Sequence, residues 1–208
     1  REQAPAPSRR APAAPMAPAP GPALEAARAR LAAAERPVVV AGVGALAHGA
    51  EAAVAETCRR FGAPLVTTYK AKGVMPEDDP LSLGGHGLSP KSDAIVLPLL
   101  RRADLVLTVG YDPIEMRAGW RDPWAPEACV ALDHLPNRHG MHGASVSFVG
   151  DAGAGLAALT EGLAPTRETW PDGEPAAARA ALEAAFADPG GWGPHAALAA
   201  ARRALPED

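Results

Sequence analysis

The stretch 103–113, ADLVLTVGYDP, decides the fold of this chain. Its apolar run at 105–109, LVLTV, follows Asp104, stops at Gly110 and is soon followed by Pro113. A short apolar run closed by Gly and Pro is typical of a strand that is buried on both faces, as in a parallel sheet. The carboxyl ends of such strands are where open α/β sheets bind ligands.

Similar strand-like runs recur along the chain and are separated by segments of helical periodicity or by long crossovers. Strands are predicted at 38–40, 64–68, 105–109, 129–132 and 145–149, with a short one at 81–83. Helices are predicted at 23–35, 50–61, 93–102, 152–163, 175–187 and 194–205. This alternation predicts a Rossmann-like three-layer α/β/α domain with a mostly parallel sheet of about six strands.

Two details of this pattern carry further expectations. Pro98 falls within the helix predicted at 93–102, so it must lie in the first turn or produce a kink. The stretch 69–92 is long for a connection within a compact domain, so we expect it to line a site or a subunit interface.

Composition divides the 208 residues into three parts. Residues 1–22 form a Pro/Ala-rich inter-domain linker, and 23–164 form the central Rossmann-like domain. Residues 165–208 form a second linker and Ala-rich helices that dock on the domain or lead to a further domain. Because the chain begins with Arg1 rather than Met, we expect it to be a piece of a longer protein.

Charge and hydropathy argue against several classes of partner. A net charge of −4 argues against a nucleic-acid partner, and no apolar run approaches the length of a membrane helix. Cys58 and Cys129 are predicted to be small buried side chains rather than a disulfide or metal pair. With no apolar signal segment at the start, we expect a cytoplasmic location.

The segment 40–49, VAGVGALAHG, places glycines between a strand and a helix, where backbone amides can hold phosphate. Gly42 and Gly44 match the first two glycines of the dinucleotide fingerprint, but Ala47 stands at the third. The second strand ends in Thr67 and Thr68, where an acidic ribose ligand would be expected. These departures favour a tight turn without a ligand over a phosphate site.

Other polar groups near the strand ends form no catalytic constellation. A loop of solvated histidines is favoured over a metal site, because the spacing of His134, His139 and His142 beside Asp133 matches no metal signature. Asp112 and Glu115 could form a carboxylate pair, but no general base can be identified. Lys70 and Lys72 are expected to be solvated. The serines Ser89, Ser92 and Ser145 lie outside any nucleophile-elbow sequence.

Taken together, the motifs resemble a known family. VVVAGVGA (38–45), PLVTTYKAKGVMPEDDPLSLGGHG (64–87) and RRADLVLTVGYDPIEM (101–116) are similar to the central domain of thiamine diphosphate-dependent enzymes of the acetolactate synthase and pyruvate oxidase group. The resemblance covers residues 36–163. The segment GYDPIE (110–115) resembles the catabolic acetolactate synthases in particular, whereas biosynthetic relatives that bind FAD have an Arg-Phe-Asp-type sequence there.

The resemblance implies an architecture and a chemistry for a larger parent protein. Thiamine diphosphate and Mg²⁺ are held by flanking pyrimidine- and diphosphate-binding domains, across the interface of a homodimer or tetramer. The parent joins two 2-oxo acid molecules, pyruvate first. The central domain is non-catalytic, positions the catalytic domains and supports oligomerisation. The segment Gly150-Asp151-Ala152 is not the Gly-Asp-Gly signature that anchors Mg²⁺ in the third domain.

The resemblance also gives a candidate ligand site, because the central domain holds FAD or ADP in some members. Topology and resemblance place such a nucleotide at the strand carboxyl ends, near Gly42, Gly44, Gly84, Gly85, His86, Gly110, Tyr111 and Asp133. No residue is assigned a catalytic or metal-binding role. The alternatives are a stand-alone module that binds FAD, ADP or NAD, and a scaffold domain without a ligand.

Overall fold

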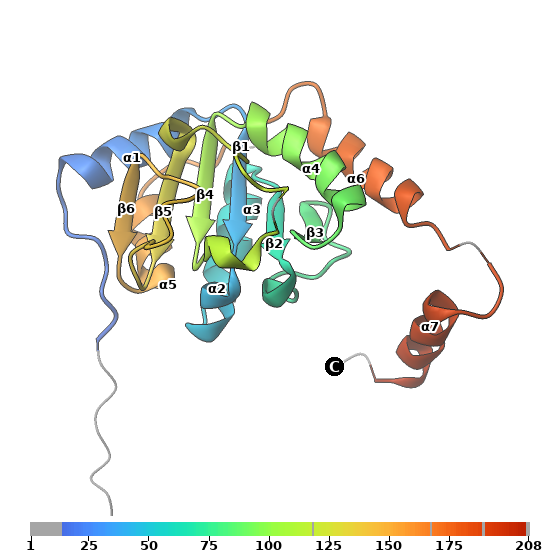
Figure 1. The fold of residues 1–208 in the computed structure, drawn as a ribbon. Coiled ribbons are helices and arrows are strands. Elements are labelled where there is room, and N and C mark those ends of the chain that lie inside the picture. Colours follow the sequence, from blue (N-terminus) through green and yellow to red (C-terminus); the bar gives the residue numbers. More distant parts are fainter. Residues whose placement is uncertain (1–13, 118, 167, 189, 207–208) are drawn as a thin grey trace, which may run out of the picture.

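A sheet of six parallel strands in the order β3-β2-β1-β4-β5-β6 lies at the centre of the structure (Figure 1). The computed structural model describes residues 14–206 except 118, 167 and 189, so the first thirteen residues of the predicted linker lie outside the described part. The strands are β1 (Pro37–Ala41), β2 (Leu65–Thr68), β3 (Ser82–His86), β4 (Leu105–Val109), β5 (Cys129–Asp133) and β6 (Val146–Val149). This confirms the predicted Rossmann-like α/β/α architecture.

α-Helices separate β1 from β2 and β3 from β4, whereas the other successive strands are joined by loops and short 3₁₀ turns. The helices are α1 (Pro22–Ala33), α2 (Val43–Ala47), α3 (Glu51–Phe61), α4 (Pro90–Arg102), α5 (Ala152–Thr160), α6 (Glu174–Ala185) and α7 (Pro194–Ala204). Short 3₁₀ turns occur at η1 (Tyr69–Ala71), η2 (Pro113–Glu115) and η3 (Pro126–Ala128). Within the described residues, no helix is both long and apolar enough to cross a membrane.

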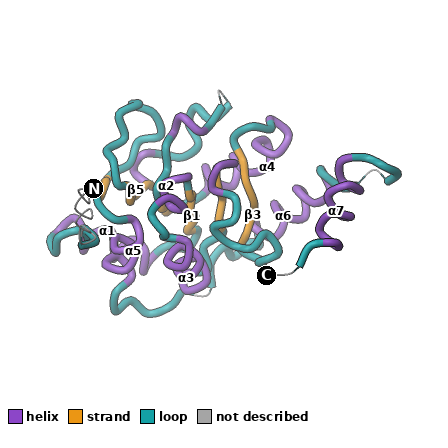
Figure 2. Tube along the Cα trace, turned by 90° about the horizontal axis from the view of Figure 1, so that it is seen from below, coloured by secondary structure: helices purple, strands orange, loops and turns teal. Residues whose placement is uncertain are grey.

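The strands β1, β2 and β4 are buried on both faces because their residues alternate between two apolar cores, whereas alternate residues of the edge strand β6 are exposed. Val39 and Ala41 belong to the core under α1, α3 and α5, whereas Val38 and Val40 belong to the core under α4 and α6. Figure 2 shows α1, α3 and α5 together on one side and α4 on the other. Cys58 and Cys129 are free and buried in these cores, which confirms them as small apolar fillers.

One local prediction needs correction. The third strand runs from Ser82 to His86, so it is longer than the strand predicted at 81–83, and Gly84, Gly85 and His86 belong to it and not to a loop. Of the two positions predicted for Pro98, the structure shows the one inside the helix, because α4 begins at Pro90. The packing of the whole helix outweighs the local preference of this proline.

Three glycines allow two loops to touch at the carboxyl edge of the sheet. A Cβ on Gly42 would lie 2.4 Å from the carbonyl oxygen of Gly110, and a Cβ on Gly44 would lie 2.8 Å from the same atom. Gly110 has a φ of 56°, and a Cβ there would lie 2.2 Å from the amide nitrogen of Ala45. The turn after β1 and the turn after β4 therefore pack backbone against backbone, which only glycine permits.

The segment that follows α5 returns to the opposite, amino edge of the sheet. Trp170 is buried there, and its indole Nε1 donates to the carbonyl of Pro37 at 2.9 Å, while its backbone N–H donates to the carbonyl of Glu35 at 2.8 Å. Trp170 has a φ of 54°, a conformation that residues other than glycine rarely adopt. Burial of the large ring offsets the backbone strain and fixes the path into α6.

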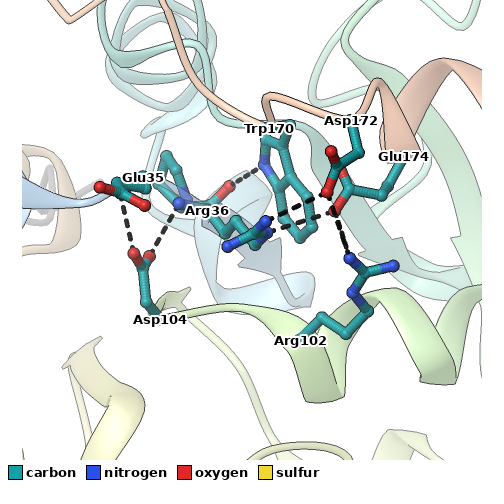
Figure 3. A network of polar contacts seen from close by, with 8 residues as sticks. Glu35, Arg36, Arg102, Asp104, Trp170, Asp172 and Glu174 are labelled. Atoms are coloured by element: carbon teal, nitrogen blue, oxygen red, sulfur yellow. Dashed lines mark hydrogen bonds and ion pairs between the residues drawn. The ribbon is translucent and has the colours of Figure 1, made fainter.

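Charged side chains surround this tryptophan (Figure 3). The guanidinium of Arg36 contacts Glu174 at 3.2 Å and Asp172 at 3.3 Å, and Arg102 at the end of α4 contacts the same two carboxylates at 2.8 and 3.6 Å. Partly exposed ion pairs of this kind each contribute little, but a network of four restricts the geometry of the segment. Helix α6 is thereby packed along α4, whereas α7 lies apart from the sheet with no buried residue (Figures 1 and 2).

The glycine contact predicts a large effect of one added methyl group. Gly110→Ala should lower the free energy of unfolding by roughly 3–5 kcal/mol, because the Cβ meets backbone atoms and the φ is left-handed. Gly140→Ala is the matched control, since its φ of 64° is similar but nothing lies within 4 Å of its Cβ position. That variant should lose only about 1–2 kcal/mol. Urea unfolding measures both, and equal losses would contradict the contact.

Trp170 provides a test of how the segment after α5 is held. Trp170→Ala should lower the free energy of unfolding by about 3–5 kcal/mol, because a buried ring is lost and a cavity is left. Trp170→Phe keeps most of the ring and removes only the bond to Pro37, so a loss of about 1–2 kcal/mol is expected. Thermal or urea unfolding measures the series. If alanine is tolerated as well as phenylalanine, the segment is not held by this ring.

Candidate functional site

The carboxyl ends of β1, β2 and β4 meet around the side chain of Glu115. This carboxylate is 4% exposed and is presented by η2, whose first residues are fixed by a bond from the amide of Ile114 to Asp112 at 3.0 Å. One carboxylate oxygen accepts from the backbone N–H of Val43 at 3.3 Å. The other accepts from the hydroxyl of Thr68 at 2.6 Å. One acidic group therefore joins the loop after β4 to the ends of β1 and β2.

The amides of the turn after β1 all donate to acceptors within the protein. The N–H of Gly42 donates to the carbonyl of Val109 at 3.0 Å, and that of Gly44 donates to the carbonyl of Gly110 at 2.9 Å. The N–H of Ala45 donates back to Gly42 at 3.0 Å. A nucleotide phosphate at this turn would need several free amides. The structure shows the tight turn that the failed fingerprint favours, with its donors used internally.

A cleft lies beside this turn, between α2 and the loops that follow β4 and β5. Its volume is about 350 Å³. It is lined by Val43, Gly44, Ala47, His48, Gly110, Tyr111, Asp112, Pro113, Asp133, His134, Leu135, Pro136, Asn137, Arg138 and His139. The lining combines basic and acidic side chains with apolar ones, so it favours no single ligand charge.

Asp133 ends β5 and forms part of the cleft wall. Its Oδ1 accepts the backbone N–H of Tyr111 at 2.8 Å, which ties β5 to the loop after β4. Burial raises the pKa of this carboxyl from 3.8 to about 7, the bond from Tyr111 opposes the shift, and the charge of Asp112 adds to it. A carboxyl with such a pKa changes its charge near neutral pH, so the local charge of the cleft varies with pH.

The histidines of the loop after β5 do not share one environment. His134 is exposed and its ring lies 4.0 Å from that of His48, and His139 is exposed with its Nε2 3.3 Å from a carboxylate oxygen of Asp112. The prediction of solvated histidines holds for these two. It is wrong for His142, which is partly buried.

His142 is held by two hydrogen bonds within the protein. Its Nε2 donates to the carbonyl of Trp120, and its Nδ1 accepts from the hydroxyl of Tyr111 at 2.7 Å. This assignment requires the neutral ring, and burial lowers the pKa of His142 accordingly. The ring of Trp124 packs edge-on against both Tyr111 and His142. His142 is therefore a structural member of an aromatic cluster that anchors the loop.

The structure brings together some of the eight predicted nucleotide-site residues and separates others. Gly44, Gly110, Tyr111 and Asp133 line the cleft. Gly42 lies behind it, against Gly110. Gly84, Gly85 and His86 lie in the edge strand β3 and do not line the cleft. Binding of a nucleotide by any of these residues stays a prediction.

The sequence motifs do not reveal the roles of two residues in this region. In the sequence, Thr68 is a departure from the dinucleotide-binding pattern, and Glu115 is one half of a possible carboxylate pair with Asp112. The structure separates that pair in role, because Asp112 caps η2 while Glu115 is buried. The available signal was an acidic residue five positions beyond a strand-ending glycine, in a segment otherwise suited to burial.

No metal site is built from the part of the chain that the structure describes. Those residues contain no group of three or more His, Cys, Asp or Glu side chains that could hold a metal ion. Asp151 caps α5, since its Oδ1 accepts the N–H of Ala154 at 2.7 Å and its own N–H donates to the carbonyl of Met16 at 2.8 Å. The Gly150-Asp151 pair thus has a local structural role.

A comparison with protein families gives the context of this fold. The family model described as thiamine pyrophosphate enzyme, central domain, matches residues 24–159. The chain belongs to this family. Thiamine pyrophosphate is the same compound as thiamine diphosphate, so the match confirms the resemblance seen in the sequence.

Curated relatives in the family catalyse different reactions. A protein of Pseudomonas aeruginosa assigned as 2-ketoarginine decarboxylase AruI is 35% identical over 71% of this chain and 25% of its own length. Acetolactate synthase of Mycobacterium avium is 34% identical over 62% of this chain and 21% of its own. Sulfoacetaldehyde acetyltransferase of Roseovarius nubinhibens is 32% identical over 57% and 20%. The chain thus spans about a quarter of these relatives or less.

A solved structure agrees with the fold. A protein of Mycobacterium smegmatis assigned as a thiamin diphosphate-dependent enzyme superposes with a TM-score of 0.55 and 27% identity. The match covers 72% of this chain and 29% of that one. The fold of this chain therefore matches one part of a longer solved chain.

The residues described do not fit the cofactors of the family. No acidic cluster suits Mg²⁺, and the turn after β1 offers no free amide to a diphosphate, because Glu115, Gly110 and Gly42 accept its hydrogen bonds. The same observation applies to FAD or ADP at that turn. We therefore assign no catalytic step to this domain.

The raised pKa of Asp133 predicts a pH dependence of stability. The folded protein binds this proton more tightly than the unfolded chain between pH 3.8 and about 7, so the free energy of unfolding should fall as pH rises through that window. Asp133→Asn keeps an oxygen for the N–H of Tyr111 but cannot ionise. The variant should therefore gain stability relative to the parent as pH rises from 4 to 7, as measured by urea unfolding at each pH. Parallel profiles would contradict a raised pKa.

Proposed function

We propose that this chain is the non-catalytic central domain of a larger thiamine diphosphate-dependent enzyme, an acetolactate synthase-like carboligase that acts on pyruvate. The observation that carries the proposal is the family match over residues 24–159 in a chain that spans about a quarter of its relatives. In this proposal the cofactor supplies a stabilised carbanion after decarboxylation, and the central domain positions the domains that hold it.

The substrate class follows from the relatives and from one segment. Acetolactate synthases recur among the relatives, and the segment GYDPIE (110–115) is similar to the catabolic enzymes of that name. The relative assigned as a 2-ketoarginine decarboxylase provides the competing substrate, a larger 2-oxo acid. Both reactions begin on a 2-oxo acid, so the proposal is specific in choosing pyruvate and carbon–carbon bond formation.

Exposed apolar side chains support a role in positioning other domains. The loops around the carboxyl edge of the sheet expose Ile114 and Leu135 at 61% each, and Leu88, Met141, Val43 and Tyr69 at 39–44%. Single exposed apolar side chains are common on protein surfaces, but six of them around one edge of the sheet indicate a contact surface. Helix α7 adds Leu198, which is 72% exposed. Contact with the flanking pyrimidine- and diphosphate-binding domains, or with a second copy in a homodimer or tetramer, would cover these groups.

The second candidate, a stand-alone module that binds FAD, ADP or NAD, has less support. Its best observation is the 350 Å³ cleft at the strand carboxyl ends, a common ligand position in this architecture. Against it, the amides after β1 are used internally, and Thr68 occupies the position where an acidic ribose ligand would be expected.

The full-length protein provides the test of the proposal. With thiamine diphosphate, Mg²⁺ and pyruvate, it should form acetolactate and CO₂ at a rate that falls to background when thiamine diphosphate is omitted. Product formation is followed by colorimetric detection of acetoin after acid decarboxylation, with 2-ketoarginine as the competing substrate. Cofactor-dependent turnover of 2-ketoarginine but not pyruvate would overturn the choice of substrate. No cofactor-dependent turnover of either acid would overturn the enzyme proposal.

A further inference from the structure

The Glu115 carboxylate is buried without a cationic partner. Among the residues described, no Lys, Arg or His nitrogen lies within 4.0 Å of it, although such ion pairs occur elsewhere in the domain. A buried carboxylate is costly unless hydrogen bonds replace its water. In this domain the replacements are the Val43 N–H and the Thr68 hydroxyl, which is itself fully buried.

Both partners of Glu115 act as donors, and this restricts the chemistry of the position. The backbone N–H of Val43 can only donate, and the short bond from Thr68 directs its hydroxyl proton at the second carboxylate oxygen. The position therefore needs a group with two acceptors. A carboxylate satisfies this requirement, whereas a glutamine amide offers one acceptor and places two N–H groups against a donor.

The two donors lie where a nucleotide-binding Rossmann-like domain makes its main contacts. In such domains the pyrophosphate lies at the turn after the first strand, and the ribose is held at the end of the second. Val43 lies in the turn after β1, and Thr68 is the last residue of β2. The Glu115 side chain, from the loop after β4, thus accepts a hydrogen bond at each of these two places.

We propose that Glu115 is an internal anion of this domain, which takes up the donors at the ends of β1 and β2 in place of an external ligand. It links the ends of three neighbouring strands, β2, β1 and β4. It also closes the turn after β1 to the diphosphate of FAD, ADP or NAD. The inference is independent of the proposed enzyme activity, because it rests on the contacts of Glu115 alone.

Chemical rescue separates this role from ordinary packing. In the full-length protein, Glu115→Ala leaves two buried donors and a space that a small carboxylate can enter. We expect its unfolding midpoint to fall by roughly 2–4 °C, and sodium formate or acetate should restore part of that loss relative to sodium chloride at equal ionic strength. The unmutated protein should show no such gain, because the Val43 N–H and the Thr68 hydroxyl already donate to Glu115.

Glu127→Ala is the matched control, since Glu127 lies in the similar 3₁₀ turn η3 but is exposed. It should change the midpoint little and should show no response to formate. Glu115→Gln keeps the shape of the side chain, so it stays informative if the alanine variant does not fold. Its midpoint should also fall, because one of the two donors loses its acceptor.

Nucleotide binding gives the second readout. The unmutated full-length protein should release no FAD or ADP on denaturation, and millimolar ADP should leave its unfolding midpoint unchanged. Release of a nucleotide, or an ADP-dependent rise of the midpoint, would overturn the proposal. A loss in Glu115→Ala that neither formate nor acetate reverses would also overturn it, since Glu115 would then act through packing alone.

Discussion

The contact between two backbone turns at the carboxyl edge of the sheet determines most of what surrounds it. Gly42 and Gly44 meet Gly110 so closely that a single Cβ on any of them would overlap backbone atoms. Because the loop after β4 lies directly on the turn after β1, the η2 residues that follow are carried over the ends of β1 and β2. The Glu115 carboxylate then accepts hydrogen bonds from Val43 and Thr68, and these bonds link the loop after β4 to the ends of β1 and β2.

In this fold, a cleft at the strand ends is therefore not by itself evidence of a ligand site. The topology of a parallel sheet places a cleft at the carboxyl ends whether or not a ligand is needed. In this domain the backbone N–H groups that could bind a phosphate donate to acceptors within the protein, and Asp133 accepts the N–H of Tyr111. Conversely, apolar groups such as Ile114 and Leu135 remain on the outer rim. These features of the edge support the proposal that the domain contacts and positions neighbouring domains.

Sequence pattern predicts the sheet well because long apolar runs such as 105–109 are buried on both faces and leave little choice of structure. It fails where tertiary contacts outweigh local preference. Gly85 pairs with Thr67 of β2 in spite of its flexibility, next to a shift in the register, and α4 continues through Pro98. It also misses His142 and Glu115, because their roles depend on partners 22 to 72 residues away in the chain. The three-part division of the chain and the eight nucleotide-site residues stay predictions.

Hydrogen exchange at the turn after β1 tests the central claim most directly. If the donors there are used by the protein, the amides of Val43 and Gly44 should exchange as slowly as those of β1 and β4, and only when the domain unfolds globally. Addition of ADP or phosphate should not slow them further. Exchange as fast as that of exposed loop amides, such as that of Gly140, would show that the turn is open and would contradict the account.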